Sequence, residues 1–479
     1  MPDENPARAT AREAIALLTG ATGFTEHRPP PHPLPPDGPL GWAGYDAARE
    51  RASARTGEEE SVVYGTGVVG DRACVLLSFE FGFLGGSLGR QTGDRLAAAY
   101  ELALTRRLPL LALVATGGSR MQEGMVALTQ LQRVAAAATR LRAAGLPQIA
   151  VVRDPTTGGG WATVGAGADV VLALPGAQVG FAGSRVRPPD ADPYAYSAKG
   201  QFAAGQVDAV VPADELAATV THWLRALGPH EDLPAAPVPR ALPGAEAEPT
   251  AGTRTGVGTP SAAGAESAAG RDSAARLPET GREAVARARD PRRPRAEAYL
   301  ADYFTVRLPL HGDRSGSTDP GLLCGLGLRA DGQPVAYVAQ CGTPTRPAGY
   351  RAAARTIRLA DRLGVPVLTL VDTPGAANDA EAERAGAGAA IADTFAAIAA
   401  ARVAVTTLVI GEGGSGGALA LAAPDNTHVT VDSYFSVIAP ELAAAILKRP
   451  PSETGATADQ LRLRPQDLVD LGFARSIVG

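Results

Sequence analysis

The chain has 479 residues, of which 45% are hydrophobic and 20% charged, and its formal net charge is −5. This length and apolar content suit two or three globular domains, and the negative charge argues against a broad nucleic-acid-binding surface. The scattered cysteines (Cys74, Cys324 and Cys341) form no CxxC pair, which argues against a zinc ribbon or a disulfide framework, so no metal site is expected. Neither a signal-peptide pattern nor a membrane-spanning apolar run is visible, so we expect a cytoplasmic protein that does not contact the membrane.

Composition divides the chain into four segments. Residues 1–36 begin with a short helical pattern and run into the proline-rich stretch RPPPHPLPPDGP, which predicts a peripheral arm. Residues 37–235 alternate strand and helix patterns. Residues 236–289 are rich in Ala, Gly, Pro and Ser with almost no large apolar side chain, so we expect a disordered linker. Residues 290–479 form a second domain of strands and helices.

Four apolar runs predict the central strands of the two domains. They are LPLLALVA at 108–115, PQIAVV at 147–152, VPVLTLV at 365–371 and VAVTTLVI at 403–410. None of them alternates apolar with polar residues, which is typical of parallel strands buried on both faces. Each run leads into a glycine-containing loop and then a helical pattern, so the prediction is an α/β fold.

The two domains are similar in sequence. Similar segments recur about 257 positions apart, at Pro109 and Pro366, at Gly158 and Gly416, and at Ala182 and Ala439. A constant spacing across three segments indicates an internal repeat. The loop PTTGGG of the first domain therefore corresponds to GSGGA of the second.

Three interpretations of the matched glycine loops remain open on the residues alone. The glycines could serve tight packing of helix on strand. Residues 411–416 also match the dinucleotide pattern GxGxxG, but the first-domain copy GGGWATVG does not keep it and no P-loop lysine follows; we expect no bound nucleotide. Alternatively, each loop could be an oxyanion hole, in which backbone N–H groups face an oxygen that gains charge during the reaction.

Longer motifs resemble a known family. The first domain resembles the β subunit of bacterial acetyl-CoA carboxylase carboxyltransferase through FEFGFLGGSLG, TGGSRMQEG, DPTTGG and GFAGSRV. The second resembles the α subunit of that enzyme through LHGDR, PAGYRAAARTIRLADRLGVPVLTLVDTPGA and IGEGGSGGALAL. The resemblance covers roughly four-fifths of the chain, with the β-type half first.

The resemblance implies a fold and a reaction. The fold would be two crotonase-superfamily domains of ββα units joined by a flexible linker. The reaction would move a carboxyl group from carboxybiotin to acetyl-CoA or another short acyl-CoA and give malonyl-CoA or a homologue, as in fatty acid biosynthesis. The chain shows no biotinyl-lysine motif, so it would need a biotin carboxyl carrier protein and a biotin carboxylase as partners. The two kinds of half would meet in a homodimer or higher oligomer.

The resemblance also implies site residues. The oxyanion holes would be formed by Gly158, Gly159 and Gly160 for the acyl thioester and by Gly416, Gly417 and Ala418 for biotin. The coenzyme A channel would be lined by Gly117, Gly118, Ser119, Arg120, Met121 and Arg185, with Arg187 as a second candidate for the phosphates. The biotin side would be bordered by Asp372, Thr373, Pro374, Gly375 and Ala376. A valine at Gly417 is then expected to fill the second hole and leave the fold mostly intact.

Some residues depart from the family or have open roles. The four-cysteine zinc ribbon of the β subunit is absent, so no zinc is expected. Trp161 stands where the family has a small residue, and its ring could narrow or obstruct the acyl pocket. Glu412 and Glu441 could be structural carboxylates or could polarise the site, and we interpret His311 as a packing residue. A biotin-independent acyl-thioester decarboxylase and a non-catalytic acyl-CoA-binding relative remain alternatives.

Overall fold

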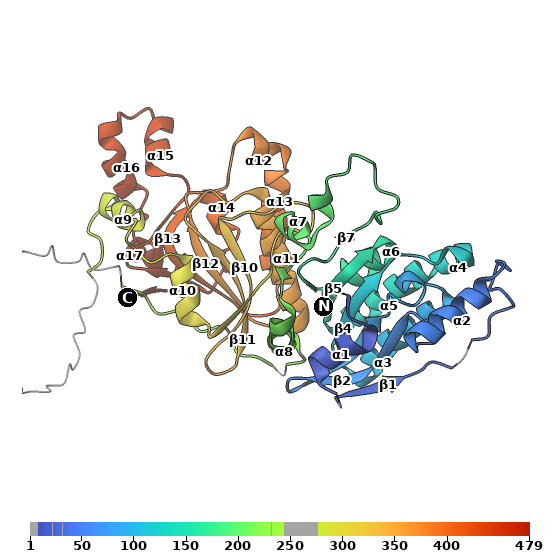
Figure 1. The fold of residues 1–479 in the computed structure, drawn as a ribbon. Coiled ribbons are helices and arrows are strands. Elements are labelled where there is room, and N and C mark those ends of the chain that lie inside the picture. Colours follow the sequence, from blue (N-terminus) through green and yellow to red (C-terminus); the bar gives the residue numbers. More distant parts are fainter. Residues whose placement is uncertain (1–7, 22, 31, 231, 244–275) are drawn as a thin grey trace, which may run out of the picture.

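The computed structural model describes residues 8–21, 23–30, 32–230, 232–243 and 276–479. These residues form two halves, each built on a mixed sheet with helices on both faces (Figure 1). The α/β prediction is therefore confirmed. No helix within the described ranges is long and apolar enough to cross a membrane.

The first half is built on strands that run in the order β1-β2-β3-β4-β5-β6-β8, with β7 paired to β5. Their bounds are β1 (Phe24–His27), β2 (Val62–Val69), β3 (Arg72–Phe79), β4 (Leu110–Thr116), β5 (Gln148–Thr157), β6 (Val170–Ala173), β7 (Val179–Gly180) and β8 (Ala209–Val210). The helices of this half are α1 (Ala11–Thr19), α2 (Tyr45–Thr56), α3 (Arg90–Arg106), α4 (Gly124–Leu128), α5 (Gln130–Ala143), α6 (Gly158–Gly160), α7 (Ala198–Ala203) and α8 (Ala213–Leu227). From β3 onward all neighbouring strands are parallel.

The second half repeats this plan, with the strand order β9-β10-β11-β12-β13-β14-β16 and β15 paired to β13. Its strands are β9 (Val306–Pro309), β10 (Leu322–Leu328), β11 (Pro334–Gln340), β12 (Val367–Thr373), β13 (Val405–Gly414), β14 (Thr427–Thr430), β15 (Tyr434–Ser436) and β16 (Ser476–Val478). Its helices are α9 (Gly281–Ala288), α10 (Ala296–Tyr303), α11 (Pro347–Leu363), α12 (Ala380–Arg384), α13 (Ala387–Ala400), α14 (Ser415–Leu419), α15 (Pro440–Ile446), α16 (Thr454–Gln460) and α17 (Pro465–Asp470). The four apolar runs predicted as buried strands are β4, β5, β12 and β13, and they are almost wholly buried.

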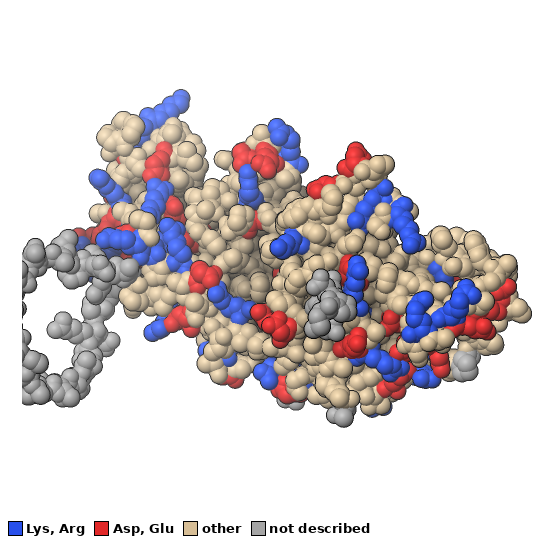
Figure 2. Space-filling model, viewed as in Figure 1, with Lys and Arg blue, Asp and Glu red and all other residues tan. Residues whose placement is uncertain are grey.

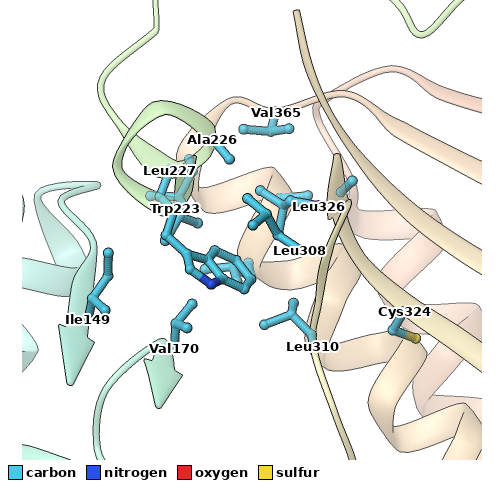
Figure 3. Close-up of a cluster of buried hydrophobic side chains, with 14 of the residues drawn as sticks. Ile149, Val170, Trp223, Ala226, Leu227, Leu308, Leu310, Cys324, Leu326 and Val365 are labelled. Atoms are coloured by element: carbon cyan, nitrogen blue, oxygen red, sulfur yellow. The ribbon is translucent and has the colours of Figure 1, made fainter. Parts of the chain in front are cut away.

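The two halves share one hydrophobic core. Trp223 of α8 is 1% exposed and lies between Ile149 and Val170 of the first sheet and Leu308 and Leu326 of the second (Figure 3). Burying an indole and the aliphatic side chains around it is worth several kcal/mol. The halves are therefore held together by apolar burial and not only by the chain that connects them.

A buried carboxylate reinforces this junction. The side chain of Asp208, next to β8, has no exposed surface and receives hydrogen bonds from Arg314 and Arg355 of the second half. The His311 ring stacks on Phe202 with centroids 4.0 Å apart, and the His311 backbone N–H also donates to Asp208. These contacts fit the interpretation of His311 as a packing or hydrogen-bonding residue.

The prediction of a peripheral arm is wrong for residues 11–27, which belong to the first half. Helix α1 starts with a capping box formed by Thr10 and Glu13, and its Ile15 and Leu18 are buried in the shared core. Strand β1 extends the first sheet by pairing with β2. The sequence shows the helical pattern, but most contacts of α1 are with β2, β3, β4 and α8, which lie more than 40 positions away.

The predicted linker is shorter than 236–289. Residues 244–275 lie outside the described residues, whereas the segments on both sides pack on the second half. The carbonyl of Ala236 accepts a hydrogen bond from Thr406 of β13, and Arg240 pairs with Asp302 of α10. On the other side, α9 contacts α16 and β13. Small residues such as alanine therefore pack here, although their composition is typical of linkers.

Charges of both signs are interspersed on the face that Figure 2 shows. Many Arg side chains of the described residues pair with Asp or Glu, for example Arg358 with Asp393 and Arg402 with Asp361. Exposed pairs of this kind contribute little to stability.

Because α1 closes the core, Ile15→Ala should lower the free energy of unfolding by about 2–5 kcal/mol, the usual cost of such a cavity. Urea unfolding followed by circular dichroism would measure this loss. Leu17→Ala on the same helix is the matched control, because Leu17 is 43% exposed and its truncation should change stability by only about 0.5 kcal/mol. Equal effects of the two variants would contradict the placement of α1 in the core.

Candidate functional site

In the first half, two glycine loops meet at the carboxyl ends of neighbouring strands. Gly117 and Gly118 follow β4, and Gly158 follows β5. A Cβ atom on Gly158 would lie 2.9 Å from the Cα of Gly118, so the loop after β4 leaves no room for a side chain at Gly158. Gly118 and Gly158 also have positive φ angles of 106° and 65°, which favour glycine. The structure thus brings together residues predicted for the coenzyme A channel and for the first oxyanion hole.

The second half has the same arrangement. Pro374, Gly375 and Ala376 follow β12, and α14 follows β13. A Cβ atom on Gly417 would lie 2.4 Å from the backbone nitrogen of Ala376, and one on Gly414 would lie 2.1 Å from the carbonyl oxygen of Pro374. The predicted biotin-side loop and the predicted second hole are therefore in direct contact as well.

The strand pairing corrects the residue correspondence by one position. β5 ends at Thr157 and β13 at Gly414, so the first helical residues Gly158 and Ser415 are equivalent, and their φ angles are 65° and 58°. The partner of Gly159 is therefore Gly416, and that of Gly160 is Gly417. The sequence comparison matched Gly158 with Gly416, because a glycine is more readily aligned with another glycine than with a serine. The sequence does not show that Ser415 adopts the same left-handed conformation as Gly158. Ala418 corresponds to Trp161.

Each loop presents backbone N–H groups at the start of a short helix. The first N–H groups of a helix have no acceptor within that helix, and among the described residues no side chain caps α6 or α14. The N–H of Gly158 donates to the carbonyl of Phe181 at 3.0 Å, so the N–H groups of Gly159 and Gly160 are the ones left for a ligand oxygen. By equivalence, Gly416 and Gly417 have this position in the second half.

The two second-loop glycines differ in the space around them. A Cβ on Gly416 would meet no atom within 4 Å, whereas one on Gly417 would also lie 2.7 Å from the Tyr350 hydroxyl. The expectation that valine at Gly417 leaves the fold mostly intact is therefore wrong, because the side chain would strike backbone. Gly416 is the position where a side chain would project into open space.

Arg120 does not line a coenzyme A channel, contrary to the prediction. Its side chain has no exposed surface and forms a paired ion contact with Glu60, at 2.5 and 2.7 Å, and a longer one with Glu123. The hydroxyl of Tyr45 donates to Glu123 within the same cluster. Arg120 therefore ties the loop after β4 to the segments that precede β2 and α4, and it acts as a structural residue.

The charges of this cluster stabilise one another. Burial opposes ionisation of Glu60, but the attraction of Arg120 and the hydrogen bonds from Arg120, Ser61 and Thr92 outweigh it and lower the pKa of Glu60 to about 2. The pKa of Arg120 is raised, because Glu60 outweighs the effect of burial. Both groups stay charged at neutral pH, and removing either would leave a buried charge without its partner.

Asp372 is likewise buried within a network of ion pairs. Its side chain has no exposed surface and binds Arg293 at 2.6 Å and Arg295 at 3.2 Å. The Thr373 hydroxyl, also buried, donates to carbonyl oxygens of Thr343 and Gly375. Only the last part of the predicted biotin-side segment, Pro374 to Ala376, has exposed surface beside the second loop.

Other predicted residues lie at the surface around the first loop. Gly117 and Arg185 are exposed, Ser119 is half-buried and Met121 is 75% exposed, so each is accessible to a ligand. Arg187 is less free, because its guanidinium lies 3.9 Å from the centre of the Tyr196 ring and donates to the carbonyl of Ala182.

Trp161 faces away from the loop. It is 7% exposed, belongs to a buried cluster with Val152 and Val171, and packs against Gly165, where a Cβ would lie 2.5 Å from the ring. The ring therefore fills the interior behind the first loop. The Trp161 ring therefore gives no support to the alternative of a non-catalytic relative with an obstructed acyl pocket.

Two residues that the sequence analysis missed support the second loop from behind. The Tyr350 hydroxyl donates to the carbonyl of Gly417 at 3.0 Å, and the buried Gln340 amide donates to Thr345 and weakly to the same carbonyl. Tyr350 lies in the motif PAGYR, which the sequence analysis used for the family resemblance. The motif does not indicate that the Tyr350 hydroxyl bonds to Gly417. Only the packing of α11 on the sheet shows this contact.

Glu412 and Glu441 belong to a structural network. Arg289 bridges them with 2.7 Å contacts to both carboxylates, and Tyr434 donates to Glu412 at 2.8 Å. Arg289 thereby fastens α15 to β13. The structural interpretation of the two carboxylates fits these contacts.

A cleft at the junction of the two halves lies away from this site. It has a volume of about 700 Å³ and is lined by residues of α8, of β9 and of the turn between β10 and β11, including His222 and Arg329. Across the described ranges, no group of three His, Cys, Asp or Glu side chains could hold a metal ion.

Two family models match the chain in succession. Residues 41–216 match the model described as carboxyl transferase domain, and residues 271–479 match acetyl co-enzyme A carboxylase carboxyltransferase-like. Each match covers one of the two glycine sites.

Curated relatives match across nearly the whole chain. The acetyl-coenzyme A carboxylase carboxyl transferase subunits beta/alpha of Saccharopolyspora erythraea are 37% identical, and the match covers 95% of this chain and 75% of the relative. The protein of the same name from Salinispora arenicola is 38% identical over 98% of this chain and 82% of its own length.

Among solved structures, transcarboxylase 12S, a hexamer described with hydrolysed methylmalonyl-coenzyme A bound, superposes with a TM-score of 0.76 at 20% identity. The match covers 98% of this chain and 87% of that one, and it confirms the predicted two-domain crotonase-like fold. Together with the duplicated glycine sites and the curated relatives, it shows that the chain belongs to the carboxyltransferase family of the biotin-dependent acyl-CoA carboxylases, with the beta-type and alpha-type halves in one polypeptide.

Proposed function

We propose that the chain transfers a carboxyl group between carboxybiotin, carried on a separate carrier protein, and acetyl-CoA or another short acyl-CoA. A biotin carboxylase would recharge the carrier. The observation that carries this proposal is the pair of equivalent glycine loops, one in each half, that present the same backbone N–H groups. Two carbonyl groups gain charge in such a transfer, and each needs donors aimed at its oxygen.

The first loop would hold the thioester oxygen of the acyl-CoA. Gly159 and Gly160 supply N–H groups, and the exposed Gly117 and Met121 border the approach. Because Gly158, Gly159 and Gly160 carry no side chain, stabilisation of charge there falls to backbone dipoles, which are fixed before the substrate arrives. Trp161 packs inward and leaves this side accessible for a short acyl chain.

The second loop would hold the ureido oxygen of biotin. When bound, carboxybiotin supplies the carboxyl group that is transferred. The fit is supported by the open space in front of Gly416 and by the close approach of Gly417 to Ala376, which leaves no side chain between a flat ring and the backbone. Tyr350 and Gln340 fix the carbonyl side of Gly417, so that the peptide N–H groups keep one direction.

The choice of acetyl-CoA over other short acyl-CoA substrates rests on the curated relatives, which are named for acetyl-coenzyme A. With acetyl-CoA the product would be malonyl-CoA, the precursor in fatty acid biosynthesis. The exposed Gly117 and the half-buried Gly158 support a short acyl chain, because neither carries a side chain that would narrow the approach.

A homodimer would complete the site by placing the first loop of one chain opposite the second loop of another. Apolar side chains are exposed beside both loops: Met121, Met125, Phe181 and Val186 in the first half, and Val437, Leu442, Ile446 and Leu447 in the second. Phe181 and Val437 follow the equivalent strands β7 and β15, and both are 73% exposed. Clusters of exposed apolar residues of this kind are typical of interfaces.

The reverse reaction tests the proposed function. Malonyl-CoA with biocytin should give acetyl-CoA, and omission of biocytin should reduce turnover at least ~10-fold, because the second loop would then lack its ligand. Formation of acetyl-CoA is measured by liquid chromatography. Equal turnover without biocytin would favour a decarboxylase, and turnover with methylmalonyl-CoA alone among the thioesters would reassign the acyl group.

Replacement of Gly416 and Gly417 separates the second site from the fold. Gly416→Val should reduce biocytin-dependent turnover at least ~10²-fold by blocking the loop, with an unchanged melting temperature because its side chain meets no neighbour. Gly417→Val should lose both activity and stability, because its Cβ would lie 2.4 Å from backbone. Full activity in Gly416→Val would refute the second site.

The proposed dimer can be tested by light scattering. Ile446→Asp, at a position that is 68% exposed, should weaken self-association at least ~10-fold by placing a charge in the apolar contact. Leu471→Asp is the control, since Leu471 is 56% exposed but lies after α17, outside the proposed contact. Unchanged dimerisation of Ile446→Asp would contradict this surface.

A further inference from the structure

Each half is preceded in the chain by a segment that packs against its sheet. In the first half this segment is residues 8–19, which include α1, and in the second half it is residues 281–303, which include α9 and α10. A buried arginine forms the contact in both cases. Neither arginine belongs to a glycine loop or to a motif shared between the halves.

In the first half the arginine lies on the strand. Arg153 of β5 is 2% exposed, and its Nη1 donates to the carbonyl of Ala9 at 2.6 Å. Its Nη2 donates to the carbonyl of Phe79 at the end of β3. The backbone N–H of Ala11 in turn donates to Glu80 at 2.8 Å. One guanidinium therefore joins the preceding segment and two strands, five residues before Gly158.

In the second half the arginine lies on the segment. Arg293 is 6% exposed, and it donates to the carbonyl of Ile410 at 3.1 Å and to the carboxylate of Asp372 at 2.6 Å. A Cβ on Gly411 would lie 2.3 Å from its Nη2, so the strand is shaped around this guanidinium. Ile410 is the position equivalent to Arg153, five residues before Ser415. Both halves thus have a guanidinium at equivalent points of β5 and β13. In the first half the strand carries the arginine, and in the second half the preceding segment carries it.

We propose that Arg153 and Arg293 are positioning residues, and that each sets the glycine loop of its own half by fixing the end of the strand that delivers it. The proposal rests on the proposed function, which assigns the acyl-CoA to the first loop and biotin to the second. Arg153 then governs use of the acyl-CoA, and Arg293 governs use of biotin. The segments before the halves are part of the support of the site.

Arginine suits this role because its rigid fork of donors reaches several acceptors at once. Burial lowers the pKa of Arg153 to about 10 against the opposing attraction of Glu80, so the group remains charged at neutral pH. A lysine keeps the charge but cannot bond two carbonyl groups in the same geometry. The strand end would shift, and displacement by about 1 Å can cost ~10²-fold in rate.

The test compares Arg153→Lys with Arg293→Lys in the reverse reaction at varied malonyl-CoA and biocytin. Arg153→Lys should raise the KM for malonyl-CoA or lower kcat by ~10-fold or more and leave the KM for biocytin within about twofold. Arg293→Lys should raise the KM for biocytin or lower kcat by ~10-fold or more and leave the KM for malonyl-CoA within about twofold. Arg402→Lys, at an exposed ion pair with Asp361, is the control and should match the wild type. Equal changes toward both substrates in either variant, or wild-type kinetics in both, would overturn the proposal.

Hydrogen exchange supplies a readout that does not depend on activity. In Arg153→Lys, amides of residues 158–166 should exchange faster while those of residues 415–421 stay unchanged, and Arg293→Lys should show the reverse. Uniform acceleration in both loops would indicate general destabilisation and would overturn the positioning role. If the wild type transfers no carboxyl group, the proposed function fails, and the exchange pattern still decides whether the arginines position the loops.

Discussion

The structure depends on the close approach of two backbone segments at the ends of neighbouring parallel strands. In the first half Gly158 meets Gly118, and in the second Gly417 meets Ala376, with distances that exclude even one added carbon atom. Parallel strands end at the same edge of a sheet, so loops that follow adjacent strands are forced together. Because glycine has no side chain, the two backbone segments can approach closely and leave N–H groups uncovered. An oxyanion site needs such uncovered N–H groups.

Around these surfaces the chain buries charge at considerable cost. Arg120 with Glu60 and Glu123 supports the loop after β4, and Asp372 with Arg293 supports the end of β12. Buried ion pairs add little net stability compared with apolar packing, but loss of one partner is severe. They hold backbone directions near the glycine loops, where a small displacement would change how an oxygen is held. Ionic residues beside a site can thus be essential without touching the substrate.

The junction of the halves holds the two glycine sites within one packed structure. Trp223 and the Asp208 carboxylate with its arginines fix the first sheet against the second. α6 and α14 nevertheless belong to different halves, as Figure 1 shows. The proposed dimer would resolve this separation by pairing loops from two chains, which agrees with the exposed apolar side chains beside each loop.

The sequence by itself determined the features that depend on local pattern: the buried strands, the repeat at a spacing of about 257 residues, the glycine loops and the order of the two family-like halves. Only the tertiary structure decided which way side chains point and what they meet. Arg120 turns inward to Glu60, and Trp161 packs behind its loop. Gly416 faces open space while its neighbour Gly417 does not, and α1 closes the core. These outcomes depend on residues distant in the chain, and the spacing of residues in a sequence carries no information on the contacts that folding creates between them.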